Sequence, residues 1–230
     1  MRRQARVAGL LYLLMGVIAP IGLVYVPSRV FVTGNPTATA DNIRTFESLL
    51  RIGIVSELLH QTIAVFLVLA LYRLFRPVNE SRARLLVILG ALVSVPIVFV
   101  NVLNEVAALT LVGGAEYLKL LSKPQLDALA YLFLQLHAKG LIVASIFWGL
   151  WLFPFGMLVI RSVFIPRLLG VLLLIAGSAY LVVAFTTLAL PRYAPLVSRF
   201  VSPLVAAELP IIFWLVIWGA RAPREQPSFI

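Results

Sequence analysis

A carboxylate and an imidazole lie three residues apart at Glu57 and His60, inside the apolar run from Ile52 to Leu71. Residues at this spacing share one face of a helix, so both side chains would point toward the same neighbours. Glu-x-x-His is also the spacing with which helix bundles present metal ligands from their cores. The alternative is an interhelical hydrogen-bond network that only fixes packing. Either way, ionisable groups inside an apolar segment require partners or water.

The composition places this pair in a membrane protein. Of the 230 residues, 62% are hydrophobic and only 12% are charged, and the mean hydropathy is +1.04. Soluble domains are nearer 45–50% apolar and about 25% charged. The net charge of +10 comes from arginines at the ends of apolar segments, which is the pattern of membrane topology rather than of nucleic-acid binding. With no cysteine, a disulfide framework or thiolate site is excluded.

The hydropathy pattern predicts an all-α fold, with six transmembrane helices in a single integral membrane domain, 1–230. The predicted segments are about 7–27, 50–75, 85–112, 124–160, 168–190 and 200–220, followed by a tail from Arg221 to Ile230. Each is longer than the ~20 residues that cross a bilayer. Eleven arginines crowd the segment ends on one side, against eight basic residues on the other. Both termini are therefore predicted to be cytoplasmic.

Local signals predict where some of these helices begin and pack. Ser122 and Gln125 form a capping-box pattern that starts the fourth helix. Asp41 is a candidate N-cap for the helix that leads into the second segment. Gly170 and Gly177 on the fifth segment would allow a neighbouring helix to approach closely.

Polar residues on five of the six segments fall in the outer half of the membrane. A helix rises about 1.5 Å per residue, so residue counts from the basic group at each inner end give depths. These are roughly 20 Å for His60 and Glu208, 24 Å for Glu57, 25 Å for Asn101, 28–30 Å for Thr186 and Thr187, 30 Å for Asn104 and Glu105, and 36 Å for His137 unless tilt or a kink at Pro154 lowers it. The inner halves of the segments are nearly pure hydrocarbon. We therefore expect a polar pocket that opens to the outside above an apolar floor.

Seven residues are predicted to line this pocket as ligand-binding groups: Glu57, His60, Asn101, Asn104, Glu105, His137 and Glu208. The favoured function is non-enzymatic binding of a small molecule, a lipid or a cation, and no catalytic residue is assigned. A metal-dependent membrane hydrolase is the first alternative, with zinc or iron held by Glu57, His60, His137 and Glu208. A structural or accessory subunit is the second. The expected partner is the lipid bilayer, with no nucleic acid, and the oligomeric state is open.

Several motifs along the whole chain resemble a known family. They are Arg6-Val-Ala-Gly-Leu-Leu-Tyr-Leu, Leu50-Arg-Ile-Gly-Ile, Arg76-Pro-Val-Asn, Asn101-x-x-Asn104, Gly113-Gly-Ala-Glu-Tyr-Leu, Ala130-x-Leu-Phe-Leu-x-x-His137, Pro166-Arg-Leu-Leu-Gly-Val-Leu-Leu and Glu208. The pattern is similar to DUF4386, a bacterial multi-pass membrane family named only as a domain of unknown function. This resemblance implies a plasma-membrane (inner-membrane) protein with about six helices. It implies no activity.

Overall fold

A computed structural model describes residues 1–220, in which every regular element is a helix. Contacts within these residues divide them into two compact units. The first unit comprises Met1–Leu13, Ala64–Val93 and residues 145–220, and the second comprises Leu14–Ile63 and Ser94–Ala144. Each unit is described by itself below.

Six helical stretches among the described residues are long and apolar enough to cross a membrane. They are Arg2–Val30, Glu47–Phe75, Glu80–Val112, Lys123–Arg161, Arg167–Ala189 and Ala194–Ile217. The all-α class and the six predicted segments are thus confirmed, with ends that differ by a few residues. The fourth stretch has 39 residues, about 58 Å of helix, which is far more than the hydrocarbon thickness. The predicted tail, with Arg221 and Arg224, lies outside the described residues.

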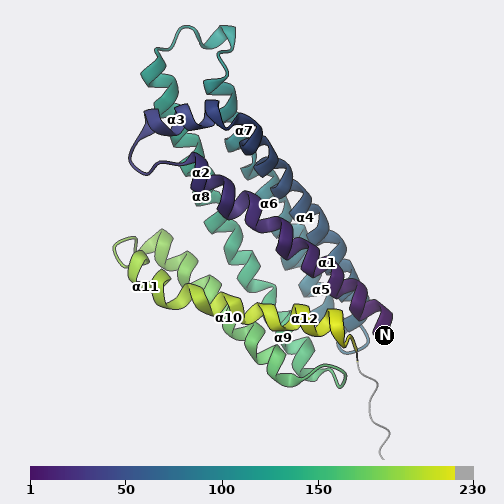
Figure 1. The fold of residues 1–230 in the computed structure, drawn as a ribbon. Helices are drawn as coiled ribbons and strands as arrows, with labels where there is room; N and C mark the ends of the chain where they lie inside the picture. Colours follow the sequence, from purple (N-terminus) through teal and green to yellow (C-terminus); the bar gives the residue numbers. More distant parts are fainter. Residues whose placement is uncertain (221–230) are drawn as a thin grey trace, which may run out of the picture. The chain divides into compact units, whose positions relative to one another are not determined.

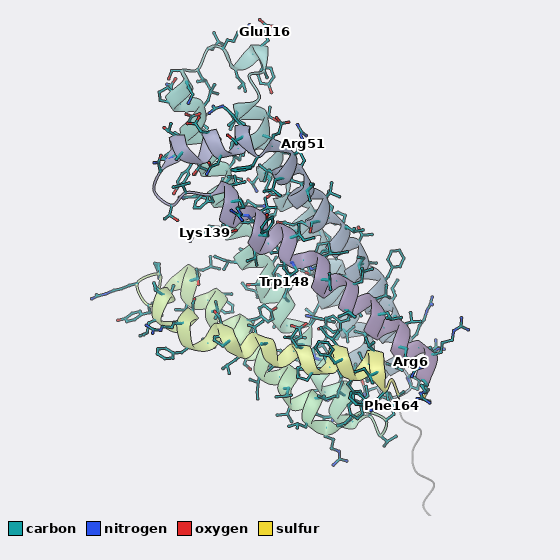
Figure 2. All side chains as sticks on the ribbon, in the orientation of Figure 1. Arg6, Arg51, Glu116, Lys139, Trp148 and Phe164 are labelled. Carbon is teal, nitrogen blue, oxygen red and sulfur yellow. The ribbon has the colours of Figure 1, made fainter. Side chains whose placement is uncertain are left out.

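The second unit gathers helices from both halves of the chain. Its elements are the later part of α1 (Arg2–Pro20), the π-helical turn η1 (Ile21–Tyr25), α2 (Val26–Val30), α3 (Pro36–Thr45), the first part of α4 (Glu47–Phe75), α6 (Ser94–Asn101), α7 (Leu103–Val112), the 3-10 turn η3 (Glu116–Leu118) and the first part of α8 (Lys123–Leu150). Within it, α3 packs against α2 and α7 (Figure 1). Its apolar core joins Val26 and Val30 to Leu50, Leu109 and Leu134. Glu116 marks the tip of the loop between α7 and α8 (Figure 2).

Helix starts in the second unit follow from their capping residues, and one prediction was wrong. The chain begins α3 at Pro36, where the Asn35 side chain accepts a hydrogen bond from the Ala38 N–H at 3.0 Å. Asp41, the predicted cap, lies inside α3 and accepts from Arg44 at 2.8 Å. An Asn cap followed by Pro at the first helical position is the stronger start signal. As predicted, Gln125 caps the start of α8 by accepting from the Ser122 N–H at 2.8 Å.

A buried ion pair fixes α8 to α3 in the second unit. The Asp127 carboxylate, whose side chain is only 2% exposed, accepts from Arg44 at 2.6 Å and from Lys123 at 2.8 Å. Two cations on one carboxylate satisfy both of its oxygens, which burial requires. Asp127 lies nearly three helical turns before His137 on α8, so this ion pair helps to fix the rotation at which α8 presents His137.

The first unit has an aromatic core and one closely packed helix pair. Its elements are the start of α1, the end of α4, α5 (Glu80–Val87), the π-helical segment η2 (Ile88–Val93), the end of α8, α9 (Leu152–Arg161), α10 (Arg167–Ala189), α11 (Ala194–Val201), the 3-10 segment η4 (Ser202–Glu208) and α12 (Leu209–Ile217). In Figure 1, α10 runs beside α9 and η4. The Phe155 ring packs 5.6 Å from Trp151 and 5.7 Å from Phe75, between ring centroids.

Candidate functional site

Three ionisable side chains from three helices meet inside the second unit. Glu57 on α4, Glu105 on α7 and His137 on α8 each offer an atom within 4.8 Å of the other two. Glu57 Oε1 lies 3.2 Å from His137 Nε2, and Glu105 Oε1 lies 3.9 Å from the same nitrogen. All three residues are buried. The arrangement places two carboxylates around one imidazole nitrogen, away from water.

The hydrogen bonds available to this cluster do not satisfy it. Glu57 Oε2 and Glu105 Oε2 are buried and have no hydrogen-bond partner in the described part of the chain. Leaving a buried polar atom unpaired costs about 1–3 kcal/mol, and more when the group is charged. The cluster therefore has more acceptor oxygens than donors, an imbalance that a cation or a donor group would remove.

Asn101 contacts the second ring nitrogen of His137, Nδ1. The Asn101 side-chain nitrogen, Nδ2, donates to the backbone carbonyl of His137 at 2.9 Å and lies 3.2 Å from His137 Nδ1. The backbone carbonyl oxygen of Asn101 lies 3.3 Å from the same Nδ1. Either neutral tautomer fits, because Nδ1 faces both a donor and an acceptor. A proton on Nδ1 leaves the Nε2 lone pair facing the carboxylates. Asn104 donates to the Asn101 side-chain oxygen at 3.2 Å, which orients that amide.

Two glycines that sequence reasoning missed make room for the cluster. A Cβ at Gly22 would lie 2.7 Å from Cγ of Glu57, and a Cβ at Gly140 would overlap the Asn101 side-chain amide. Gly22 therefore lets η1 approach α4 where Glu57 lies, and Gly140 lets α8 approach α6. The signal for Gly140 was present in the sequence, since it lies three residues after His137 and shares its helix face.

Replacing Gly140 with alanine should destabilise the protein, although alanine is the better helix former by about 1 kcal/mol. The added methyl would displace the Asn101 amide from His137 and Asn104, and the loss of these buried hydrogen bonds is expected to cost about 1–3 kcal/mol. Denaturant unfolding of the purified protein measures this. Gly16→Ala is the control, because a Cβ there meets nothing within 4 Å. Equal stability of the two variants would contradict the role assigned to Gly140.

A partly open cavity of about 380 Å³ adjoins the cluster within the second unit. Glu105 and His137 contribute to its wall, together with apolar residues of η1, α2, α4 and α8. The wall comprises Leu23, Val26, Pro27, Ser28, Val30, Phe31, Leu50, Glu105, Leu134, His137, Ala138 and Leu141. Its lining is mostly apolar with a few polar groups at one place, which is typical of small-molecule sites.

The structure brings together five of the seven predicted pocket residues. The cluster consists of Glu57, Glu105 and His137. Asn101 contacts the His137 ring, and Asn104 donates a hydrogen bond to Asn101. His60 is buried on α4, one turn from Glu57, and is not in the three-residue group found among the described residues. Glu208 belongs to the first unit, where Tyr12 donates a hydrogen bond to its Oε1.

The depth that a straight-helix count gives for His137 does not hold in the structure. Residue counting placed it roughly 12 Å further out than Glu57, whereas the two side chains are in contact. Counting assumes straight, parallel helices whose inner ends are level, and it cannot register tilt or a helix that projects beyond its neighbours. His137 itself is buried, whereas Gln135 and Lys139 (Figure 2), on the opposite face of α8, are exposed.

The helices and the cluster together define a multi-pass α-helical membrane protein with a buried carboxylate–histidine group. The chain belongs to the DUF4386 family, a domain of unknown function whose family model matches residues 7–219. This confirms the resemblance seen in the sequence motifs. No curated protein and no solved structure matches the chain.

Proposed function

We propose that this protein is a non-enzymatic binding protein whose cavity in the second unit holds a small amphiphilic molecule. The observation that carries the proposal is the shared wall: Glu105 and His137 belong both to the polar cluster and to the cavity. The remaining lining is almost entirely apolar. Such a cavity suits a ligand with an apolar body and one polar head. The volume of about 380 Å³ is within the usual range for small-molecule sites.

The proposed setting is the bacterial plasma membrane, with both termini cytoplasmic and the cavity reached from the outer side. The arginine pairs at Arg73 and Arg76, and at Arg161 and Arg167, support this orientation, because short cytoplasmic loops are enriched in basic residues. Six spans also require both termini to lie on the same side. A purely structural subunit is the weaker alternative, since it gives no reason for a cavity beside two buried carboxylate oxygens that have no hydrogen-bond partner among the described residues.

A photoreactive ligand tests the proposal. The full chain in phosphatidylcholine vesicles is mixed with decanol that carries a diazirine on its alkyl chain, irradiated and digested. We expect labelling that excess decanol competes away, on peptides from η1 and α2 and from the part of α8 near His137. These segments supply most of the cavity wall. Labelling spread evenly over all lipid-facing helices would overturn the proposal.

Filling the cavity should abolish that labelling. In Leu134→Trp, the larger side chain replaces a buried residue of the cavity wall, and we expect at least a tenfold loss of competed label. Leu136→Trp is the matched control on the same helix, because Leu136 is 46% exposed and is not part of the wall. Undiminished labelling of a folded Leu134→Trp variant would count against this cavity as the site.

A metal-dependent hydrolase is the second candidate, and one observation favours it. An imidazole and two carboxylates within 4.8 Å form a donor set that can hold a metal, which could then activate water. This candidate predicts hydrolysis of 4-nitrophenyl decanoate by the zinc-loaded protein, with loss of the activity in Glu57→Gln. If the wild type and Glu57→Gln hydrolyse the ester at equal rates, the hydrolase is ruled out and only the binding function remains.

A further inference from the structure

We propose that Glu57, Glu105 and His137 bind one divalent transition-metal ion, and that this ion selects ligands with an anionic head. This inference deepens the proposed function and rests on it, because the cluster is the polar end of the same cavity. It also changes the ligand set expected from the sequence, with Glu105 in place of His60 and Glu208.

The geometry of the three donor atoms is close to that of a metal site. Bonds of about 2.0–2.2 Å to nitrogen and oxygen put neighbouring ligands of a tetrahedral ion about 3.3–3.6 Å apart. In the structure, His137 Nε2 lies 3.2 Å from Glu57 Oε1 and 3.9 Å from Glu105 Oε1. The largest separation in the group is at most 4.8 Å. A movement of about 1 Å by one flexible carboxylate would therefore complete the arrangement.

Two further observations point to a cation rather than to simple packing. The first is the pair of buried carboxylate oxygens, one on Glu57 and one on Glu105, for which residues 1–220 offer no hydrogen-bond partner. The second is the environment of the opposite ring nitrogen of His137, which lies 3.3 Å from the backbone carbonyl oxygen of Asn101 as well as 3.2 Å from its side-chain nitrogen, so that a proton on Nδ1 has an acceptor. Metal-binding histidines commonly donate their second N–H to a backbone carbonyl, which orients the ring and directs the other nitrogen at the metal.

The donor set indicates the class of ion. One imidazole and two carboxylates suit zinc, manganese or iron(II), whereas calcium and magnesium prefer oxygen ligands alone. Three protein ligands leave at least one coordination position for another molecule. Since Glu105 and His137 also belong to the cavity wall, that position is available to the head of a bound amphiphile.

The ion would determine which head group is accepted. Without it, two carboxylates favour a cationic head and repel an anionic one. With it, a carboxylate head becomes a fourth ligand. Metal loading should therefore reverse the preference of the cavity from decylamine to decanoate.

The first part of the test measures metal binding. The purified full chain is stripped with EDTA, incubated with zinc chloride or manganese chloride and desalted, and its metal content is determined by elemental analysis. We expect about one equivalent per chain, with a rise in Tm of about 5–10 °C when the free metal is near a hundred times Kd. Glu57→Gln and Glu105→Gln should each weaken binding by at least a hundredfold.

Glu208→Gln is the matched control, because it removes a carboxylate from the first unit, where Glu208 bonds to Tyr12. It should bind metal as the wild type does. Loss of metal in this variant, or retention of it in both cluster variants when they are folded, would overturn the assignment. Binding of less than a tenth of an equivalent by the wild type would also overturn it.

The second part measures head-group preference by competition against the photoreactive decanol. In the stripped protein decylamine should compete better than decanoate, and zinc should reverse that order by at least tenfold. Competed labelling that is indifferent to metal would overturn the metal inference while leaving the binding function intact. Absence of competed labelling together with stoichiometric metal would instead overturn the ligand-binding function alone.

Discussion

His137→Leu should lower the free energy of unfolding by about 3–5 kcal/mol, measured on protein kept in EDTA. The substitution removes the hydrogen bond between His137 Nε2 and Glu57 Oε1 and leaves two buried carboxyl groups without the imidazole between them. Removing one partner from a buried pair of ionisable groups typically costs this much, because the remaining group keeps its desolvation penalty and loses its compensation. Denaturant titration followed by circular dichroism, in detergent micelles, gives the measurement.

The informative control is a triple variant rather than a second single one. Adding Glu57→Met and Glu105→Met to His137→Leu replaces the whole cluster with apolar side chains of similar size. Such replacements of buried ion pairs are often neutral or stabilising, so most of the lost stability should return. The idea that the three residues act as one buried ionisable group fails in either of two cases. One is that His137→Leu lowers the free energy of unfolding by less than about 1 kcal/mol, and the other is that the triple variant is less stable than His137→Leu.

This prediction depends on contacts that the sequence indicated only in part. Hydropathy was sufficient for the six spans, because a bilayer requires about 20 apolar residues in a row and that requirement is visible in one dimension. Helical phase placed Glu57 and His60 on one face of a helix, and both are buried, but of the two only Glu57 belongs to the cluster found among the described residues.

Which helix faces meet could not be derived from the sequence. That outcome depends on tilt, on how far each helix projects and on where backbones can approach, and none of these has a periodic signature. The depth of His137 shows the difficulty, because a straight-line count separated it from Glu57 although the two are bonded. Gly22 was missed for the same reason, since its importance arises from atoms on another helix.

The fifth span was the exception among these helix contacts, because small residues on one face of a transmembrane helix do indicate a close approach by another helix. Gly170 and Gly177 on α10 were predicted to allow such an approach, and the structure confirms it. A Cβ at Gly170 would lie 2.6 Å from the Gly156 carbonyl oxygen, and a Cβ at Gly177 would lie 2.8 Å from the Gly149 carbonyl oxygen. Both pairs lie in the first unit, so α10 contacts the backbone of the preceding span at two levels.

Gly170→Leu should therefore reduce the free energy of unfolding by about 3 kcal/mol or more, at or above the upper end for overpacked sites. The new side chain would meet the Gly156 carbonyl oxygen at 2.6 Å and the Ile160 backbone nitrogen at 3.0 Å. Backbone atoms cannot rotate away as a side chain can, so the two helices must separate and lose their mutual packing along the contact. Gly170→Ala should have a smaller effect of the same sign, which keeps the measurement interpretable if the leucine variant does not fold.

Gly16→Leu distinguishes this mechanism from a general intolerance of glycine replacement. Gly16 lies in α1 with nothing within 4 Å of an added Cβ, and leucine has the higher helix propensity. The control should therefore unfold at the same or slightly higher denaturant concentration than the wild type. A Gly170→Leu variant as stable as Gly16→Leu would mean that backbone contact between α9 and α10 does not hold the first unit together.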